Sequence, residues 1–247
     1  MRLTISDGAY ERETLAYLVG TLSDLFSQTG CNWFERADDD RAELTVEVPA
    51  FYADIVKGEI DDKISDIVSV SYKYDFFAKK IKPSGLSELE NEILIASLIA
   101  ADLEEDKRYV SRRIRADSEI AIDGLYHFRL KPLKQKWEEI CSYMPDYFIN
   151  SQLREFITFL LEDKSQRVLV EGNNVYDSHY RHLMRNELLG GKEEGKIIKE
   201  IILSGCGEVE LSGKIPEVDE FYLKEYFGDK IILNKGYFSC LLYTSPS

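Results

Sequence analysis

The chain has 247 residues, of which 44% are hydrophobic and 12% aromatic, enough apolar material for one large or two small globular domains. Its net charge is −14 at pH 7 and its isoelectric point is near 4.8. An acidic chain of this kind argues against wholesale binding to nucleic acid or to an anionic membrane, because both attract positively charged surfaces. The positive charges are unevenly spread, however, and many of them fall within residues 107–136.

Three features of the sequence bear on its cellular compartment. The longest apolar run, Ile93 to Ala101, is far shorter than the roughly 20 residues that a membrane helix needs. The N-terminal segment lacks the apolar core of a signal peptide. The four cysteines are scattered and form no CxxC pair, so they indicate neither a zinc site nor a disulfide framework. We therefore expect a cytoplasmic protein with no membrane insertion, no metal and no cofactor.

The first predicted unit is a small α+β head over residues 1–49. A helix is expected from Tyr10 to Gln28, where apolar residues recur at helical spacing, and Gly30 is expected to end it. Three segments are expected to form strands: Arg2 to Ser6, Cys31 to Arg36 and Leu44 to Val48. The acidic stretch 38–40 supplies the turn between the last two strands.

The second predicted unit is a helical region over residues 50–165. Its expected helices are Phe51 to Ile81, Ser87 to Arg115, Leu133 to Tyr143 and Tyr147 to Leu161. Ser87 and Glu90 have the spacing of a capping box, in which each side chain accepts a hydrogen bond from the other residue's backbone amide. Pro145 is expected to open the last helix, because proline is tolerated at a helix start.

The third predicted unit is a small α+β unit over residues 166–239. Its expected strands are Arg167 to Glu171, Asn174 to Asp177, Glu208 to Leu211 and Lys230 to Leu233, and its expected helices are Lys192 to Leu203 and Val218 to Phe227. The first two strands are expected to form a hairpin that turns at Gly172-Asn173. The sequence thus predicts an α+β fold with a helical middle and small β-sheets near the N- and C-terminal ends.

The final segment, residues 240–247, resembles a peptide translated from a sequencing adapter. We interpret it as an artefact and expect the natural protein to continue differently from about residue 239. No function is assigned to this segment.

His179 and His182 form an HxxH pair, and on a helix this spacing would place both rings on one face. A metal site usually needs a third ligand and supporting hydrogen bonds. Asp177 is the nearest acidic residue and a weak candidate for that role. We interpret the two histidines as an exposed pair near the end of the hairpin.

Four carboxylates follow the apolar run directly: Asp102, Glu104, Glu105 and Asp106. Paired carboxylates can bind a hard cation or exchange protons with a substrate. Here Glu104 and Arg108 are spaced to interact along one helix face. We interpret the cluster as a solvated helix end.

Other catalytic motifs are missing from the sequence. Gly190-Gly191-Lys192 resembles a phosphate-binding loop only superficially, because the first glycine is missing and Glu193 replaces the hydroxyl residue. The patterns GxSxG, HExxH and GxGxxG do not occur. Cys141 lies in an aromatic-rich helix pattern and is interpreted as a core residue. No catalytic residue is assigned.

The basic cluster is the most suggestive binding feature. Its members are Lys107, Arg108, Arg112, Arg113, Arg115, Arg129, Lys131, Lys134 and Lys136, and the aromatic residues among them are Tyr109, Tyr126, His127, Phe128 and Trp137. Basic groups can neutralise phosphates while aromatic rings stack on bases. Alternatively, the basic stems pack on the core and their charges meet the carboxylates of the chain. The net charge favours the alternative.

The cluster lies in a stretch that resembles a known family. The run Tyr126 to Lys131, the helical segment Leu153 to Leu161 and the hairpin ending in Val175 to Asp177 resemble the YtxC-like sporulation proteins of spore-forming Firmicutes. The resemblance covers roughly Ile93 to Leu211. The chain departs from the family pattern at Pro132, directly after the F-R-L-K run, and in the missing glutamate-lysine-glutamate lead-in to the later helix. Because the family has no established biochemical activity, the resemblance implies spore formation and no mechanism.

The leading hypothesis is a non-enzymatic cytoplasmic protein of spore formation that acts through contacts with an unknown protein partner. The candidate binding residues are Arg112, Arg113, Arg129, Lys131 and Lys134. One alternative is a nucleic-acid-binding module built on the cluster at 107–136, whose binding would weaken steeply with salt. Another is an enzyme of unknown type that uses His179, His182 or the carboxylates at 102–106.

Overall fold

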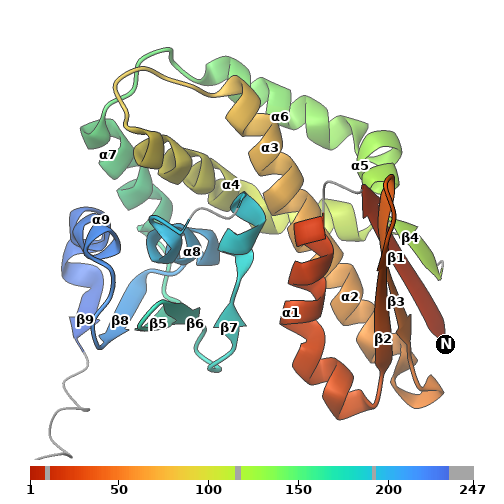
Figure 1. The fold of residues 1–247 in the computed structure, drawn as a ribbon. Coiled ribbons are helices and arrows are strands. Elements are labelled where there is room, and N and C mark those ends of the chain that lie inside the picture. Colours follow the sequence, from red (N-terminus) through yellow and green to blue (C-terminus); the bar gives the residue numbers. More distant parts are fainter. Residues whose placement is uncertain (9–11, 115–117, 191–192, 234–247) are drawn as a thin grey trace, which may run out of the picture. The chain divides into compact units, whose positions relative to one another are not determined.

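The computed structural model describes residues 1–8, 12–114, 118–190 and 193–233. It confirms the predicted α+β class, with a mostly helical middle and two small sheets, one built near each end of the chain (Figure 1). Tyr10, Arg115, Lys192 and the segment 240–247 lie outside the described residues.

The described residues form two compact units, each assembled from segments that are distant in sequence. Unit 1 contains Met1–Ile81, Asp102–Met144 and Glu187–Gly191. Unit 2 contains Lys82–Ala101, Pro145–Asn186 and the described residues of the range Lys192–Ser247. The predicted division along the chain at residues 49 and 165 stays a prediction.

The sheet of unit 1 has the strand order β2-β3-β1-β4. Its strands are β1 (Arg2–Gly8), β2 (Asn32–Ala37), β3 (Arg41–Glu47) and β4 (Glu119–Ala121). β3 pairs antiparallel with both β1 and β2, which agrees with the three predicted strands. The fourth strand was not predicted: β4 pairs parallel with β1, with Thr4 opposite Glu119.

Helix α1 (Arg12–Thr29) lies against this sheet and packs on α2 (Figure 1). Leu18, Leu22 and Phe26 recur at helical spacing and are buried, as expected for the core-facing side of an amphipathic helix. Gly30 follows α1 with φ of 68°, a conformation that favours glycine at a helix C-terminus.

The predicted helix from Phe51 to Ile81 is interrupted. It consists of a 3-10 turn η1 (Ala50–Tyr52), α2 (Ala53–Ile67), a π-helical turn η2 (Val68–Tyr72) and α3 (Lys73–Lys80). A π turn inserts an extra residue, and it thereby rotates the side chains that follow by about 100° around the helix axis. The rotation affects the residues that follow η2, beginning with Lys73.

Helix α4 (Glu88–Ser111) contains a kink, because Asp102 has the non-helical angles φ −133° and ψ 18°. The capping box at its start is confirmed: the Ser87 amide donates to Glu90 Oε2 at 2.7 Å, and the Glu90 amide donates to Ser87 Oγ at 3.2 Å. The division between the two units falls at the kink, since Ala101 belongs to unit 2 and Asp102 to unit 1.

Two further helices complete the helical part of unit 1. They are α5 (Ile122–Arg129), which the sequence did not predict, and α6 (Lys131–Tyr143). Pro132 lies in the first turn of α6, where its missing N–H has no helical partner to lose. Leu133 and Trp137 form the buried side of α6.

The sheet of unit 2 has the strand order β7-β6-β5-β8-β9. Its strands are β5 (Arg167–Glu171), β6 (Asn174–Tyr176), β7 (His182–Leu183), β8 (Glu208–Ser212) and β9 (Ile231–Leu233). The predicted hairpin is confirmed: β5 and β6 pair antiparallel, and Gly172 has φ of 58° in the turn between them. β8 joins β5 and β9 in parallel.

Three helices follow the first half of α4 in unit 2: α7 (Asn150–Leu161), α8 (Lys196–Ser204) and α9 (Glu217–Phe227). Two 3-10 turns complete the element order: η3 (Arg185–Leu189) and η4 (Gly228–Lys230).

The prediction that Pro145 opens a helix at Tyr147 is wrong, because α7 begins at Asn150. Ser84 forms a parallel β-bridge with Tyr147, in which the Ser84 amide donates to Asp146 O and the Phe148 amide donates to Ser84 O, each at 2.9 Å. This bridge uses peptide groups that a first helical turn would need. Within the described residues, no helix has both the length and the apolar character needed to cross a bilayer.

Candidate functional site

A network of buried charges surrounds Asp106 on the second half of α4. Asp106 is fully buried, and its Oδ2 accepts hydrogen bonds from Lys73 Nζ at 2.7 Å and from Trp137 Nε1 at 2.9 Å. Its Oδ1 accepts from Lys136 Nζ at 2.9 Å. Lys73 also forms an ion pair with Asp102. The solvated helix end predicted for these carboxylates is therefore wrong for Asp106, although Glu104 and Glu105 are exposed.

The network forms because Asp102 and Asp106 are four residues apart and so share one face of α4. The buried Lys73, which directly follows the π turn, lies between them. Lys136 approaches from α6 and pairs with both aspartates and with Glu105. Partial burial acts to lower the pKa of Lys136, but hydrogen bonds to three carboxylates outweigh it and raise the pKa above its usual value.

Lys107 belongs to a second buried network, so its charge is not available on the surface with the rest of the basic cluster. Lys107 Nζ lies 2.9 Å from Asp66 Oδ1 and 3.0 Å from Asp62 Oδ1. Tyr17 Oη donates to Asp66 Oδ2 at 3.2 Å. In both networks the buried carboxylates are paired with cations and accept hydrogen bonds from polar groups. These side chains therefore stabilise the fold, and none of them has the arrangement of a general acid or base that awaits a substrate.

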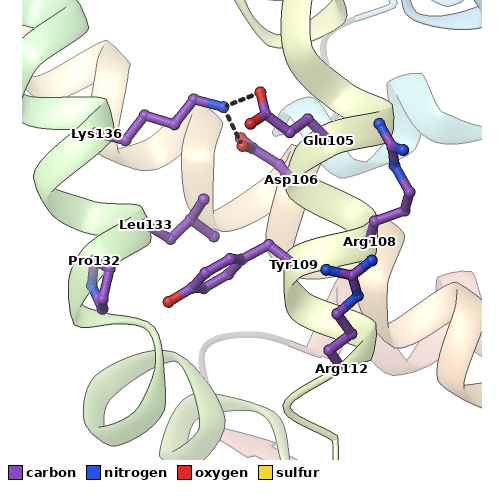
Figure 2. Close-up of a pocket in the computed structure, with 8 residues that line it drawn as sticks. All are labelled: Glu105, Asp106, Arg108, Tyr109, Arg112, Pro132, Leu133 and Lys136. Atoms are coloured by element: carbon purple, nitrogen blue, oxygen red, sulfur yellow. Dashed lines mark hydrogen bonds and ion pairs between the residues drawn. The ribbon is translucent and has the colours of Figure 1, made fainter.

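A pocket of about 450 Å³ lies beside the first network, between α4 and α6 (Figure 2). Its lining residues are Glu105, Asp106, Arg108, Tyr109, Arg112, Pro132, Leu133 and Lys136. Figure 2 shows Lys136 directed at Glu105 and Asp106, whereas Arg108 and Arg112 extend from α4 away from these carboxylates. We call this site the α4–α6 pocket.

The five candidate binding residues, Arg112, Arg113, Arg129, Lys131 and Lys134, are called the basic surface from here on. Arg113 Nη1 donates to Tyr109 O at 3.3 Å, and its guanidinium lies 3.5 Å from the centre of the Tyr109 ring. Arg129 Nη1 donates to Arg113 O at 3.4 Å, which joins the end of α5 to the end of α4.

Lys134 Nζ lies 4.6 Å from the centre of the Tyr126 ring and 3.5 Å from His127 O. Arg112 lines the α4–α6 pocket, and Lys131 is exposed. Across the described ranges, no residue of the basic surface is paired with a carboxylate. The structure thus divides the predicted cluster: Lys107 and Lys136 are neutralised in buried networks, whereas the basic surface keeps its charge.

The histidines near the hairpin do not form a metal site. The Asp177 carboxylate accepts backbone hydrogen bonds from His179 at 2.8 Å and Arg181 at 2.9 Å, and it pairs with the Arg181 side chain. Partial burial acts to raise the pKa of Asp177, but the Arg181 contacts outweigh it and lower the pKa. His182 lies in β7 rather than on a helix. Where the structure describes the chain, no group of three or more His, Cys, Asp or Glu could hold a metal ion.

Unit 2 has buried charges that the sequence analysis missed. Lys199 Nζ lies 3.0 Å from Glu92 Oε2, and both side chains are buried. Asp219, also buried, accepts a hydrogen bond from the Ile198 amide at 2.9 Å, near the start of α8. Apolar spacing assigned these segments to helices but gave no sign that their charged residues face inward.

Cys141 and Cys206 lack the features of a catalytic nucleophile. Burial raises the pKa of the Cys206 thiol to about 11. Partial burial also raises the pKa of Cys141, which lies on α6. Because the thiolate is the reactive form, both thiols are poor nucleophiles near neutral pH.

Comparison of the chain with protein-family models, curated proteins and solved structures finds no match. The resemblance to the YtxC-like family stays a prediction.

Proposed function

We propose that this protein is a non-enzymatic cytoplasmic protein of spore formation, which acts by binding a partner protein through its basic surface. The observation that carries the proposal is a set of cations without carboxylate partners on a chain of net charge −14. Phe128, next to Arg129, is 85% exposed. Exposed aromatic and arginine side chains are frequent in protein interfaces. The link to spore formation rests on the family resemblance alone.

The surroundings of the aromatic side chains favour a protein partner over nucleic acid. Trp137 is buried, and its ring stacks against Tyr126 with centroids 6.2 Å apart. Arg113 covers one face of Tyr109. Trp137 is therefore not available to stack on bases, and Arg113 occupies one face of Tyr109, so the cluster offers fewer stacking surfaces than its aromatic residues predict.

Charge reversal of the basic surface is expected to abolish capture of the partner. In the Arg129→Glu/Lys131→Glu variant, both substituted side chains are exposed, so helicity should be unchanged. The partner would face carboxylates in place of cations, and like charges across an interface oppose binding. The measurement is affinity capture from sporulating cells with quantitative mass spectrometry, alongside far-ultraviolet circular dichroism.

The matched control is the Lys164→Glu/Lys214→Glu variant, which makes the same change of net charge at two exposed lysines of unit 2. It should capture the partner as the wild type does. Equal capture by the wild type and the Arg129→Glu/Lys131→Glu variant would refute the proposal. Capture of an oligonucleotide that weakens steeply with salt would favour the nucleic-acid alternative.

A further inference from the structure

We infer that the α4–α6 pocket recognises a peptide segment of the partner in which an acidic side chain neighbours an apolar one. This inference rests on the proposed function and adds the chemistry of the partner. The pocket of about 450 Å³ is the size of a site for a few side chains rather than for a whole domain surface.

One part of the pocket is apolar and held in place. The ring of Tyr109 and the side chains of Pro132 and Leu133 form this wall (Figure 2). Arg113 fixes the ring, because its guanidinium stacks on it while its Nη1 bonds to the backbone of Tyr109. Leu133 is buried in α6. An apolar side chain of the partner would be removed from water when it packs on this wall, and the side chains of the wall would not need to change conformation.

A second part of the pocket is positively charged. Arg108 uses Nε to donate to Glu104 O, at 3.1 Å, and no ion pair joins it or Arg112 to a carboxylate in the described segments. Guanidinium groups bind carboxylates through two parallel N–H···O bonds. Lys136, in contrast, is already bound by carboxylates. The pocket therefore suits one acidic side chain at the arginines, whereas Glu105 and Asp106 would repel a polyanion.

The hydroxyl of Tyr109 is closed to a ligand, whereas the residue lines the pocket with its ring. The oxygen is buried and has no hydrogen-bond partner among the described residues. In Figure 2 this hydroxyl points toward Pro132, away from the two arginines. A ligand in the pocket therefore contacts the ring of Tyr109 and the guanidinium groups, and a peptide segment with adjacent apolar and acidic side chains supplies both contacts.

The test uses fluorescence anisotropy with a labelled synthetic peptide that alternates glutamate and leucine. Two matched peptides replace every glutamate with glutamine or every leucine with serine. The Arg108→Gln/Arg112→Gln variant should bind the first peptide at least about tenfold more weakly, because it loses charge-assisted hydrogen bonds. The control variant Lys164→Gln/Lys214→Gln, with the same loss of charge outside the pocket, should bind as the wild type does.

A second variant, Tyr109→Phe, keeps the ring and removes only the hydroxyl. The unliganded protein should remain as stable as the wild type, since the hydroxyl has no bond to lose, and affinity for the acidic peptide should be unchanged, because the ring that lines the pocket is kept. A loss of affinity in this variant would contradict the wall described for the pocket. Equal binding of all three peptides, or of the Arg108→Gln/Arg112→Gln variant and the wild type, would overturn the inference. Tighter binding of a single-stranded oligonucleotide than of the acidic peptide would also overturn the inference.

The two proposals fail in distinguishable ways. If the charge-reversed Arg129→Glu/Lys131→Glu variant loses the partner but the peptide does not bind the pocket, the proposed function stands and this inference falls. If the peptide binds through Arg108 and Arg112 but no partner is captured, the pocket chemistry stands and the proposed function falls.

Discussion

Replacing Asp106 with alanine is expected to lower the free energy of unfolding by about 3–5 kcal/mol. The carboxylate is fully buried and accepts hydrogen bonds from Lys73, Lys136 and Trp137. Without it, the buried Lys73 would keep Asp102 alone, and a buried cation with too few partners is costly. Urea denaturation at pH 7, followed by circular dichroism, measures the change.

The control for this prediction is an exposed ion pair in the same unit. Lys80 Nζ lies 2.5 Å from Glu138 Oε2. The side chain of Lys80 is 40% exposed and that of Glu138 is 59% exposed. Glu138→Ala should therefore cost less than about 1 kcal/mol, since solvent screens such pairs. Equal losses for Asp106→Ala and Glu138→Ala would show that the Asp106 network does not support the fold as described.

Replacing Gly207 with alanine is expected to destabilise unit 2 by about 3 kcal/mol. A Cβ at this position would lie 1.8 Å from Lys164 O, a backbone atom that cannot rotate away. The Gly207 amide also donates to Gln166 O at 2.9 Å, directly before β5, so relief of the clash would displace this strand. The loss is measured by urea denaturation of the whole protein, followed by circular dichroism.

Gly58→Ala is the matched control, because it adds the same methyl group in open space. A Cβ at Gly58 would meet nothing within 4 Å, and the residue lies inside α2. Alanine has the higher helix propensity, so this variant should gain about 0.5–1 kcal/mol. A loss at Gly58, or no loss at Gly207, would contradict the packing around these two glycines.

Local patterns in the sequence were sufficient for most of the fold. The hairpin at Gly172-Asn173 and the capping box at Ser87 involve neighbouring residues, and both are confirmed. β4 was missed because it is three residues long and its partner, β1, is more than a hundred residues away in sequence. Short strands of this kind exist only through pairing with a distant segment, which periodicity cannot show.

The burial of charge could not be predicted in the same way. Asp102 and Asp106 were interpreted as part of a solvated helix end, and charged side chains are in general almost never fully buried unless they are paired. The structure pairs them with the buried Lys73. Their pairing depends on the π turn that precedes Lys73 and on the kink at Asp102, and neither irregularity has a signature in the sequence. The interpretation of these carboxylates as solvated is therefore wrong for Asp106, whereas Glu104 and Glu105 are exposed as expected.

The candidate site was predicted in part. The sequence identified the cations but not which of them are neutralised. Lys107 and Lys136 confirm the alternative in which the charges meet carboxylates, because each lies within 3.0 Å of buried acids. Arg108 and Arg112 depart from it, since both line the α4–α6 pocket and neither forms an ion pair in the described part of the chain. For Lys107, Arg108 and Arg112, the separation depends on the direction in which each side chain extends after the kink in α4.

The most direct test of the proposed function is a count of heat-resistant spores from a strain that lacks this gene, with vegetative growth as the control. We expect fewer spores and normal growth, with the defect restored by the wild-type gene but not by the Arg129→Glu/Lys131→Glu variant. An unchanged spore count in the deletion strain would contradict the proposed role in spore formation.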